Sequence, residues 1–306
     1  MMTLNDLQKK WNETSPYTDG FLQVSEGHPL SVHVGYENEQ RCFVILDTGR
    51  IDTIESSKAI DAVCIKLSAE RYGLRFLLKY PSLDELFVKL CWDLMECSKD
   101  SENPLRAVLD RYSNWLILLQ KAKAGIMSAS RQKGLLAELL YLKEQIQLIG
   151  ESDALEAWVG PEGCDQDFVF ADSWSEVKAT SKASTSVTIS SLQQLDREDT
   201  GELIVYFMDK LSAQGNEDFS LPQVIEEIKD MIHLPHNKDL YDCKLAMYGY
   251  YLKDADQYLG IYYNLSERRA YEVRSSFPKL TVQNVPYEIT EAKYRIDLAS
   301  IESFRH

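Results

Sequence analysis

The first hundred residues alternate apolar and polar positions over short stretches, which is typical of a region with both helices and strands. The predicted elements are a helix over 3–11, strands over "SVHVGY" (31–36) and "RCFVIL" (41–46), and a helix over 80–99. In the last of these, Ser82 and Glu85 have the spacing of a capping box. A turn-like "SENP" follows at 101–104. We therefore predict an accessory α+β region over residues 1–100.

The middle of the chain changes from helical to strand periodicity. The predicted elements are helices over 105–122 and 131–149, strands over 167–171, 174–180, 186–190 and 203–209, and a helix that begins near Pro222. This order predicts an α/β (α+β) core, which we place at residues 101–235. Residues 236–306 hold four strand-like segments rich in tyrosine: "KLAMYGYYL", "YLGIYYN", "RAYEVRS" and "KYRIDL". They form a strand-rich extension that either joins the core sheet or makes a separate lobe.

Glu138 is an isolated charge within the predicted helix 131–149. The residues three and four positions away are all uncharged: Gly134, Leu135, Tyr141 and Leu142. Its carboxylate therefore has no countercharge on its own helix. Because burying an unpaired charge is costly, Glu138 either stays in water or meets a partner from another element.

The composition is that of a soluble globular protein. No apolar run approaches the roughly 18 residues needed to cross a bilayer, and the start, "MMTLNDLQKKW", lacks the apolar core of a secretory signal. The six cysteines form no Cys-x-x-Cys pair, which disfavours a disulfide framework and a thiolate zinc site. We expect a cytoplasmic protein that does not bind membranes.

The chain has 33 basic and 48 acidic residues, and its net charge of −15 disfavours indiscriminate coating of nucleic acid. The balance reverses between Asn103 and Lys143, where seven Lys or Arg residues accompany two acidic ones. This basic stripe either guides a polyanion toward a site or consists of ordinary solvated helix faces.

The triplet Glu176-Val-Lys178 has the letters of a nuclease motif, but the letters alone are weak evidence. A chain with 48 acids and 33 bases holds about five acid-x-base triplets by chance. Decoys with the same letters stand, for example, at 242–244, 272–274 and 291–293. Only the surroundings of Glu176 and Lys178 can separate this triplet from the rest.

Those surroundings predict a hairpin that turns at Asp172 and Ser173. In that register the facing pairs are Ala171 with Trp174, Val169 with Glu176, and Asp167 with Lys178. Because side chains alternate across a sheet, three polar groups share one face: Asp167, Glu176 and Lys178. The opposite face carries apolar groups suited to a core: Phe168, Phe170 and Val177. The diagonal from Asp167 to Glu176 spans about 7 Å, so both carboxylates could reach one ion.

Two carboxylates and a lysine on one face suit metal-assisted hydrolysis of a phosphodiester. Mg²⁺ or Mn²⁺ takes oxygen ligands and can also take a phosphate oxygen. The lysine can position and help deprotonate a water or stabilise the charged transition state. The alternative is an ordinary cross-strand salt bridge between Lys178 and Asp167, which would contribute little.

Four blocks in order, "GLLAELLYLKEQI", "WVGPEGCDQDFVF", "EVKAT" and "TISSLQQL", resemble the PD-(D/E)XK family of prokaryotic proteins. This family belongs to the restriction-endonuclease-like superfamily, and the resemblance covers roughly residues 130–210. It implies a mixed central sheet flanked by helices and a Mg²⁺- or Mn²⁺-dependent endonuclease that cleaves DNA. It further implies a place in a restriction or phage-defence system, with helicase or ATPase partners.

The resemblance also implies five site residues. The matched positions are the helix acid Glu138, the first-strand aspartate Asp167, the pair Glu176 and Lys178, and the glutamine Gln194. The three acids would hold the metal. No proline directly precedes Asp167, which departs from the family motif, and Asp165 is a rival first-strand ligand. Gln194 also fits a capping box with Ser191.

Other patterns support no competing enzyme. His233-Leu-Pro-His236 has a metal-like spacing, but its proline indicates a surface turn. Walker-type phosphate loops and Gly-x-Ser-x-Gly elbows do not occur. The alternative hypothesis is a catalytically inactive nuclease-like scaffold or nucleic-acid-binding subunit, since a fold does not fix its chemistry. The residues do not distinguish DNA from RNA as the substrate, and they leave the oligomeric state open.

Overall fold

The computed structural model describes residues 2–17, 20–24, 27–51, 53–121, 127–211, 215 and 218–306, without the side chains of Ser82, residues 117–121 and Lys253. The chain forms two compact units. The first unit comprises Met1–Ala124 and Lys238–Gly249, and the second comprises Gly125–Asn237 and Tyr250–His306. Within the described residues, no helix combines the length and the apolar character that crossing a bilayer would require.

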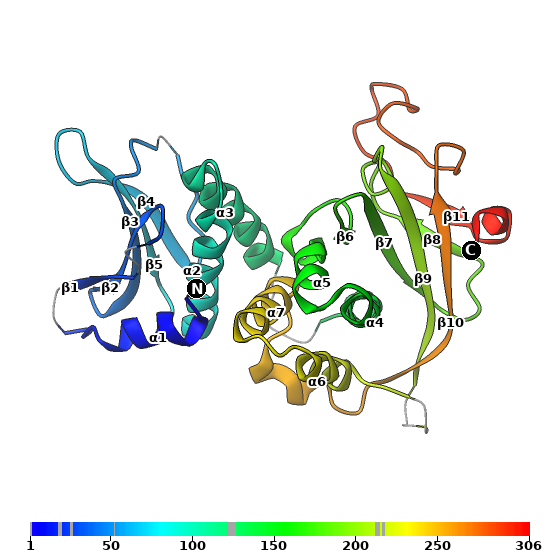
Figure 1. Cartoon of the computed structure of the whole chain (residues 1–306), viewed down its shortest axis with the longest axis horizontal. Coiled ribbons are helices and arrows are strands. Elements are labelled where there is room, and N and C mark those ends of the chain that lie inside the picture. Colours follow the sequence, from blue (N-terminus) through cyan, green and yellow to red (C-terminus); the bar gives the residue numbers. More distant parts are fainter. Residues whose placement is uncertain are drawn as a thin grey trace. The chain divides into compact units, whose positions relative to one another are not determined.

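The first unit holds an antiparallel five-stranded sheet with helices packed on it (Figure 1). The strands are β1 (Gly20–Gln23), β2 (Ser31–Glu37), β3 (Gln40–Leu46), β5 (Tyr72–Leu78) and β4 (Ile60–Lys66), in sheet order. The helices are α1 (Leu4–Asn12), α2 (Asp84–Lys99), α3 (Pro104–Lys121) and most of α7 (Pro235–Tyr248). The strands predicted at 31–36 and 41–46 are confirmed. The break predicted near residue 100 falls between α2 and α3, inside this unit.

Helix starts in the first unit follow local capping chemistry. Thr3 caps α1, and its side chain and that of Asp6 form a reciprocal capping box. The capping box predicted from Ser82 and Glu85 is wrong, because a 3₁₀ turn over Pro81–Leu83 precedes α2, which begins at Asp84 with no side-chain cap. Proline fixes the backbone of that turn and delays the α-helix.

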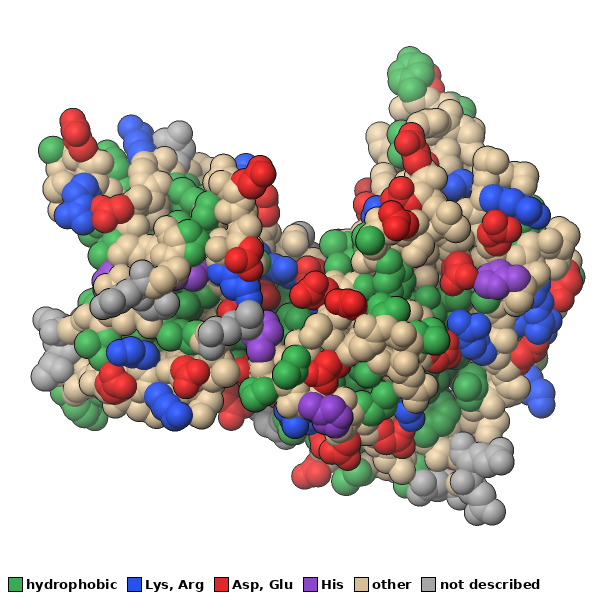
Figure 2. All heavy atoms as spheres, viewed as in Figure 1, with side chains coloured by type: hydrophobic (Ala, Val, Ile, Leu, Met, Phe, Trp, Pro, Cys, Tyr) green, Lys and Arg blue, Asp and Glu red, His purple; other side chains and the backbone are tan. Residues whose placement is uncertain are grey.

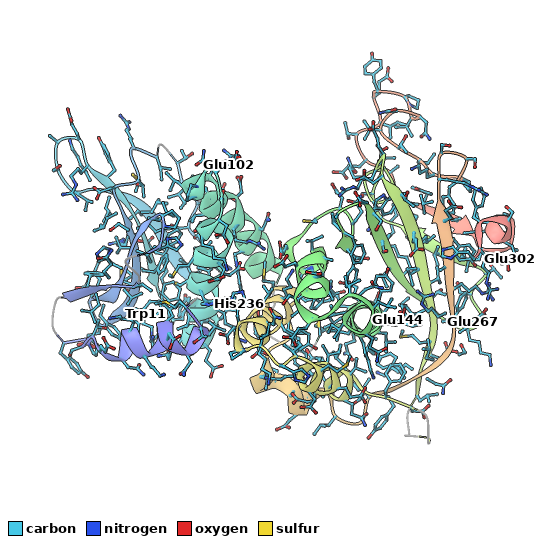
Figure 3. The ribbon with its side chains drawn as sticks, viewed as in Figure 1. Trp11, Glu102, Glu144, His236, Glu267 and Glu302 are labelled. Carbon is cyan, nitrogen blue, oxygen red and sulfur yellow. The ribbon has the colours of Figure 1, made fainter. Side chains whose placement is uncertain are left out.

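Tryptophans anchor the core of the first unit. Trp11 is fully buried, and its Nε1–H donates to the Gly35 carbonyl at 3.0 Å, which fixes α1 on β2 (Figure 3). Trp115 donates in the same way to the buried carboxylate of Asp93 at 2.8 Å, and so joins α3 to α2. Each indole buries a large apolar ring while its N–H finds an acceptor.

The second unit is built on a four-stranded mixed sheet (Figure 1). Its strands, in sheet order, are β10 (Tyr262–Val273), β9 (Thr200–Leu211), β7 (Ser173–Thr180) and β6 (Phe168–Val169). β7 and β9 run parallel, whereas the two outer pairings are antiparallel. The predicted mixed central sheet is confirmed, and β10 shows that part of the C-terminal extension joins it.

Helices cover one face of this sheet. They are α4 (Ala129–Ile149), α5 (Glu151–Ala157), α6 (Leu221–Met231) and the 3₁₀ helix η3 (Leu252–Tyr258). α4 lies against β7 and β9, and its Glu144 accepts a hydrogen bond from Tyr206 Oη at 2.7 Å and pairs with Arg268 at 3.0 Å (Figure 3). Tyr141 Oη and Ser175 Oγ are 2.8 Å apart. Polar contacts therefore fix how α4 sits on the sheet.

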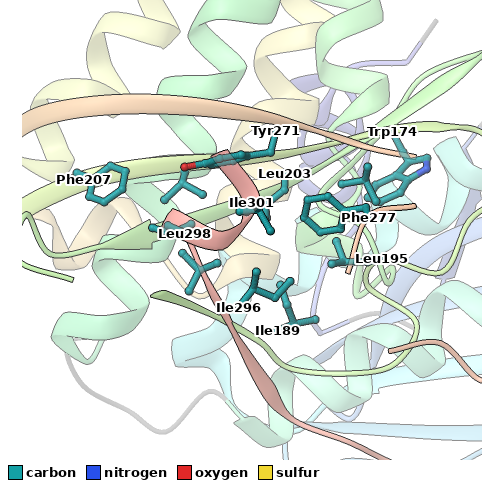
Figure 4. Packing of buried hydrophobic residues seen from close by; sticks show 13 residues of the cluster. Trp174, Ile189, Leu195, Leu203, Phe207, Tyr271, Phe277, Ile296, Leu298 and Ile301 are labelled. Atoms are coloured by element: carbon teal, nitrogen blue, oxygen red, sulfur yellow. The ribbon is translucent and has the colours of Figure 1, made fainter. Parts of the chain in front are cut away.

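The opposite face carries a small second layer of strands. β8 (Ser186–Ile189) pairs antiparallel with β11 (Tyr294–Asp297), and the 3₁₀ helix η4 (Ala299–Phe304) follows. Between this layer and the sheet lies a buried cluster in which Trp174 lies beside Leu195 and Phe277 (Figure 4). The central sheet is thus flanked by helices on one face and by the β8–β11 pair on the other.

The strand predicted over 244–252 is wrong, because those residues largely belong to α7 (Pro235–Tyr248). Cys243, Lys244, Leu245, Ala246 and Met247 are all buried, so the run shows neither a helical nor a strand period of burial. The proline in His233-Leu-Pro-His236 stands at the first position of this helix, where its missing N–H costs nothing.

Gly201 tests the packing of the sheet, because a methyl group at its Cα would lie 2.1 Å from the Trp174 ring. We expect Gly201→Ala to lower the free energy of unfolding by about 1–3 kcal/mol in urea titrations, as overpacked cores do. Gly20→Ala is the matched control, because nothing lies within 4 Å of its Cβ position. Equal stability of the two variants would contradict this account of the core.

Candidate active site

Strand β7 (Ser173–Thr180) is buried on both faces along its first half. Trp174 enters the cluster under the β8–β11 layer, whereas Ser175 contacts α4. Since side chains alternate, Glu176 and Lys178 project on the side of Trp174, and Val177 projects toward α4. The apolar and small residues of β7 therefore determine the face on which its charges lie.

The predicted hairpin forms, but its turn lies one residue earlier than expected. Ala171 and Asp172 make the turn, and the Phe170 N–H donates to the Ser173 carbonyl at 2.8 Å. Phe168 therefore pairs with Ser175 and Val169 with Trp174. This register differs from the predicted one by two residues. A shift of two leaves every side chain on its predicted face, so Asp167 still shares a face with the Glu176-x-Lys178 pair.

Asp167 immediately precedes β6, and its side chain continues the pairing with β7. Its Oδ2 accepts the Val177 N–H at 2.8 Å, in the place where a strand carbonyl would otherwise bond. Its own backbone carbonyl accepts the N–H groups of Val159 and Gly160 at 3.0 and 2.9 Å. Three hydrogen bonds thus fix the Asp167 backbone and one carboxylate oxygen, and leave Oδ1 facing the cluster.

Glu176 and Lys178 form a buried ion pair on β7. Lys178 Nζ donates to Glu176 Oε1, and the Glu176 side chain is fully shielded from solvent. The other carboxylate oxygen, Oε2, is buried without a hydrogen-bond partner. A buried carboxylate oxygen without a donor is costly, so this position is suited to a ligand that supplies positive charge.

Glu138 is buried on α4, as its uncharged surroundings in the sequence allow. The Trp158 Nε1–H donates to its Oε2 at 2.8 Å, so of the two predicted alternatives the partner from another element is the one observed. A methyl group at Gly160 would lie 3.0 Å from Glu138 Oε2 and 3.1 Å from Asp167 Oδ1. Both carboxylates therefore face the same small volume in front of Gly160.

Gln194 does not share this arrangement. Its side-chain Oε1 accepts the Ser190 N–H at 2.7 Å, and its backbone N–H donates to Ser191 Oγ at 3.3 Å. Only the second bond belongs to the predicted capping box, because the side chain bonds Ser190 instead of Ser191 and a turn, not a helix, follows. Asp165, the rival first-strand ligand, is exposed, whereas Asp167 is partly buried. The structure thus gathers Glu138, Asp167, Glu176 and Lys178, and holds the side chain of Gln194 in its own turn.

Burial shifts the pKa values of the cluster. Desolvation, followed by the charge of Asp167, raises the pKa of Glu176 to about 8, although Lys178 opposes this shift. Burial likewise raises the pKa of Asp167. Burial alone would lower the pKa of Lys178, but the neighbouring carboxylates, Glu176 first, raise it above its ordinary value. The ammonium therefore stays charged while the carboxylates hold a proton more readily than usual.

The basic stripe between Asn103 and Lys143 is divided between the two units. Arg106 pairs with Asp110, Arg111 with Asp93, and Lys143 with Glu227. The Lys121 side chain and Lys123 lie outside the described residues. Positive and negative side chains are interspersed over the surface drawn in Figure 2. At least three of the seven cations are therefore paired, two of them at the surface and Arg111 with the buried Asp93.

The cluster can be compared with what a divalent cation requires. Within the described residues, no group of three or more His, Cys, Asp or Glu is gathered closely enough to hold a metal. Mg²⁺ usually keeps several waters and is bound through one or two carboxylates. Asp167 and Glu176 supply such a pair, and the unsatisfied Glu176 Oε2 is a hard oxygen ligand. The residues present fit a Mg²⁺ or Mn²⁺ ion bound by two carboxylates.

Comparison with known families shows which family the chain matches. Residues 7–299 match the family described as "Putative PD-(D/E)XK family member, (DUF4420)". The chain belongs to this family. Searches of curated proteins and of solved structures found no match. The family resemblance predicted from four sequence blocks is thus confirmed and extends over both units.

Three residues that sequence reasoning did not single out shape the site: Trp158, Gly160 and Gln166. The first two lie beside Glu138, and the Gln166 amide donates to the Gln193 carbonyl at 2.8 Å, which joins the strand of Asp167 to the turn at 190–196. A signal was present in "WVGPEGCDQD", where a glycine and a tryptophan stand just before the aspartate. Their roles depend on close approach in space, which the sequence does not display.

The raised pKa of Glu176 predicts how stability varies with pH in metal-free protein. Its folded pKa of about 8 lies above its ordinary value of 4.5, so the carboxyl stabilises the fold at low pH and this contribution is lost as the pH rises. We expect the unfolding free energy of wild type relative to Glu176→Gln to fall by on the order of 3 kcal/mol between pH 5 and 8. Urea unfolding in EDTA measures this difference, and parallel pH profiles would contradict it.

Proposed function

We propose that this protein is a metal-dependent nuclease that hydrolyses DNA phosphodiester bonds within a prokaryotic restriction or phage-defence system. The observation that carries the proposal is the buried cluster of Asp167, Glu176 and Lys178 with one carboxylate oxygen unsatisfied. Membership of the family supports a nuclease-like fold, and the cluster supplies two acids and a lysine that suit the chemistry.

Lys178 acts as a fixed positive charge in this proposal. Its raised pKa keeps the ammonium protonated near neutral pH, so it stabilises negative charge that develops on the phosphate instead of removing a proton. Its bond to Glu176 Oε1 holds Nζ in position before a substrate arrives. A donor that needs no reorganisation during the reaction is more effective than one that must be ordered first.

The carboxylates of Asp167 and Glu176 would bind the divalent cation and fix its position. Asp167 is fixed by the Val177 N–H, so its Oδ1 has a defined direction, and Glu176 offers Oε2. Mg²⁺ or Mn²⁺ bound there would offset the charge of the phosphate and assist the attack of water. Glu138 reaches the same volume from α4, where Trp158 holds one of its oxygens and prevents it from turning away.

Substitution of the two charged groups on β7 tests the assignment. We expect Glu176→Gln and Lys178→Met each to lower the rate of DNA cleavage in Mg²⁺ by on the order of a thousandfold, because each removes charge at the reacting phosphate. The matched control is Glu272→Gln on β10, within the chance triplet Glu272-Val-Arg274, which should cleave as wild type does. Wild-type rates in both β7 variants would overturn the proposal.

Metal binding separates the enzyme from the alternative, an inactive scaffold. Isothermal titration with Mn²⁺ should show binding to wild type that is lost in Asp167→Asn and in Glu176→Gln, with circular dichroism unchanged. EDTA should abolish cleavage, and added Mg²⁺ should restore it. A protein that binds Mn²⁺ equally well with and without these carboxylates would instead be assigned to the scaffold class, with helicase or ATPase partners supplying the activity of the assembly.

A further inference from the structure

A cavity of about 460 Å³ lies in the second unit, between the segment 278–280, strand β11 and helix η4. Its size falls in the range of pockets that enclose small-molecule ligands. Ile296 and Ile301 line it from the buried cluster, where Figure 4 shows both side chains. Leu280 and Tyr294 add further apolar surface to the lining. The cavity therefore offers an apolar surface against which one planar chemical group can pack.

Cations lie in the same lining. Arg295 is exposed and has no acidic partner among the described residues, and Lys279 is partly buried. Lys279 Nζ donates to the Leu195 carbonyl at 2.7 Å, which leaves further N–H donors for a ligand. The one acid in the lining, Asp297, accepts the N–H and O–H of Ser300 at 2.9 and 2.7 Å, so its carboxylate is already engaged within its own segment. The lining thus combines apolar walls with a net positive charge in a protein of net charge −15.

Hydrogen bonds connect this cavity with the cluster on β7. Gln166, next to Asp167, donates to the Gln193 carbonyl at 2.8 Å, and Lys279 bonds the Leu195 carbonyl in the same turn. Tyr294 packs on the buried cluster that also contains Trp174, so it points into the layer that Glu176 faces. Burial raises the pKa of Tyr294, and the charges of Glu176 and Lys178 also act on it. The cavity lining and the cluster are therefore both bonded to the turn at 190–196, and Tyr294 lies in the layer that Glu176 faces.

We propose that this cavity binds one unpaired nucleotide of the substrate strand, with its base against Tyr294 and Leu280 and its phosphate at Arg295 and Lys279. The proposal rests on the proposed nuclease function and names its substrate class: nucleic acid with unpaired bases, such as single strands or the ends of opened duplexes. Aromatic rings stack on any base, and an arginine that lacks a protein partner is free to bind a phosphate. A paired base would bring its complementary strand, for which a cavity of this size leaves no room.

Binding in EDTA tests the cavity apart from cleavage. A fluorescein-labelled 20-nucleotide oligo(dT) is titrated with full-length protein, and anisotropy is recorded at several salt concentrations. We expect Arg295→Ala to weaken binding by on the order of tenfold and to reduce the slope of log K against log salt by about 0.7, as the loss of one phosphate contact to a single strand does. Lys210→Ala, which removes a charge outside the lining, should bind as wild type does.

Substitutions of Tyr294 distinguish the contribution of base stacking from that of charge. Tyr294→Leu should weaken binding by on the order of tenfold without changing the salt slope, and Tyr294→Phe should restore affinity because its ring remains. Thermal melting establishes that the variants fold, and the exposed Arg295 carries the test if Tyr294→Leu does not. Wild-type binding of a fully paired 20-base-pair duplex should be weaker than binding of oligo(dT).

The outcomes distinguish the two proposals. The proposal that the cavity binds a nucleotide would be overturned by either of two results, even if cleavage depends on Glu176. One is equal affinity of wild type and Arg295→Ala for oligo(dT), and the other is an equal loss of affinity in Arg295→Ala and Lys210→Ala. If binding depends on Arg295 and Tyr294 but cleavage does not depend on Glu176, the proposal that the cavity binds a nucleotide stands and the nuclease assignment is overturned.

Discussion

The second unit depends on a strand that is buried on both faces and still carries an ion pair. Trp174 is fixed in the core by its close fit to Gly201 and by the bond from its indole to the Asp199 carbonyl at 3.1 Å. Alternation then forces Glu176 onto the same buried face. Removing a carboxylate from water is expensive, and one partner, Lys178, satisfies only one of its oxygens. The buried Glu176–Lys178 pair therefore lowers the stability of the fold at a site where its charges can serve a reaction.

The two faces of the central sheet have different tasks. On the α4 face, polar groups are satisfied in pairs, as in Tyr141 with Ser175 and Glu144 with Tyr206 and Arg268. Such satisfied contacts fix the helix on the sheet. On the opposite face, the pair on β7 keeps an unsatisfied oxygen, and Glu138 reaches the edge of the sheet to face Asp167. The rigid α4 face supports the position of groups whose surroundings are incomplete.

Alternation and spacing in the sequence were sufficient to predict strands β6, β7 and β9 and the face on which Asp167, Glu176 and Lys178 lie. For Glu138 they left two alternatives, exposure to water or a partner from another element. The exact hairpin turn was not predictable, because Ala171-Asp172 and Asp172-Ser173 both suit a tight turn. The error left every side chain on its predicted face only because it shifted the strand register by an even number of residues. Helix α7 was misjudged because its residues 243–247 are all buried, so this part of the helix shows no apolar–polar period. The contacts of Gly160 and Trp158 with the site arise from tertiary packing, to which no local pattern corresponds.

The triplet on β10 shows what the letters of the motif omit. Glu272-Val-Arg274 has the same acid-x-base order, and its side chains also pair, at 3.5 Å. Both are about half exposed, with 46% and 52% of their side-chain surface in water, whereas Glu176 has none. Water screens the first pair, so its charges are worth little to each other or to a ligand. The same chemistry inside the protein acts on its neighbours with far greater strength. Burial on the sheet, which Trp174 and Gly201 impose, is therefore the property that turns an ordinary triplet into a candidate active site.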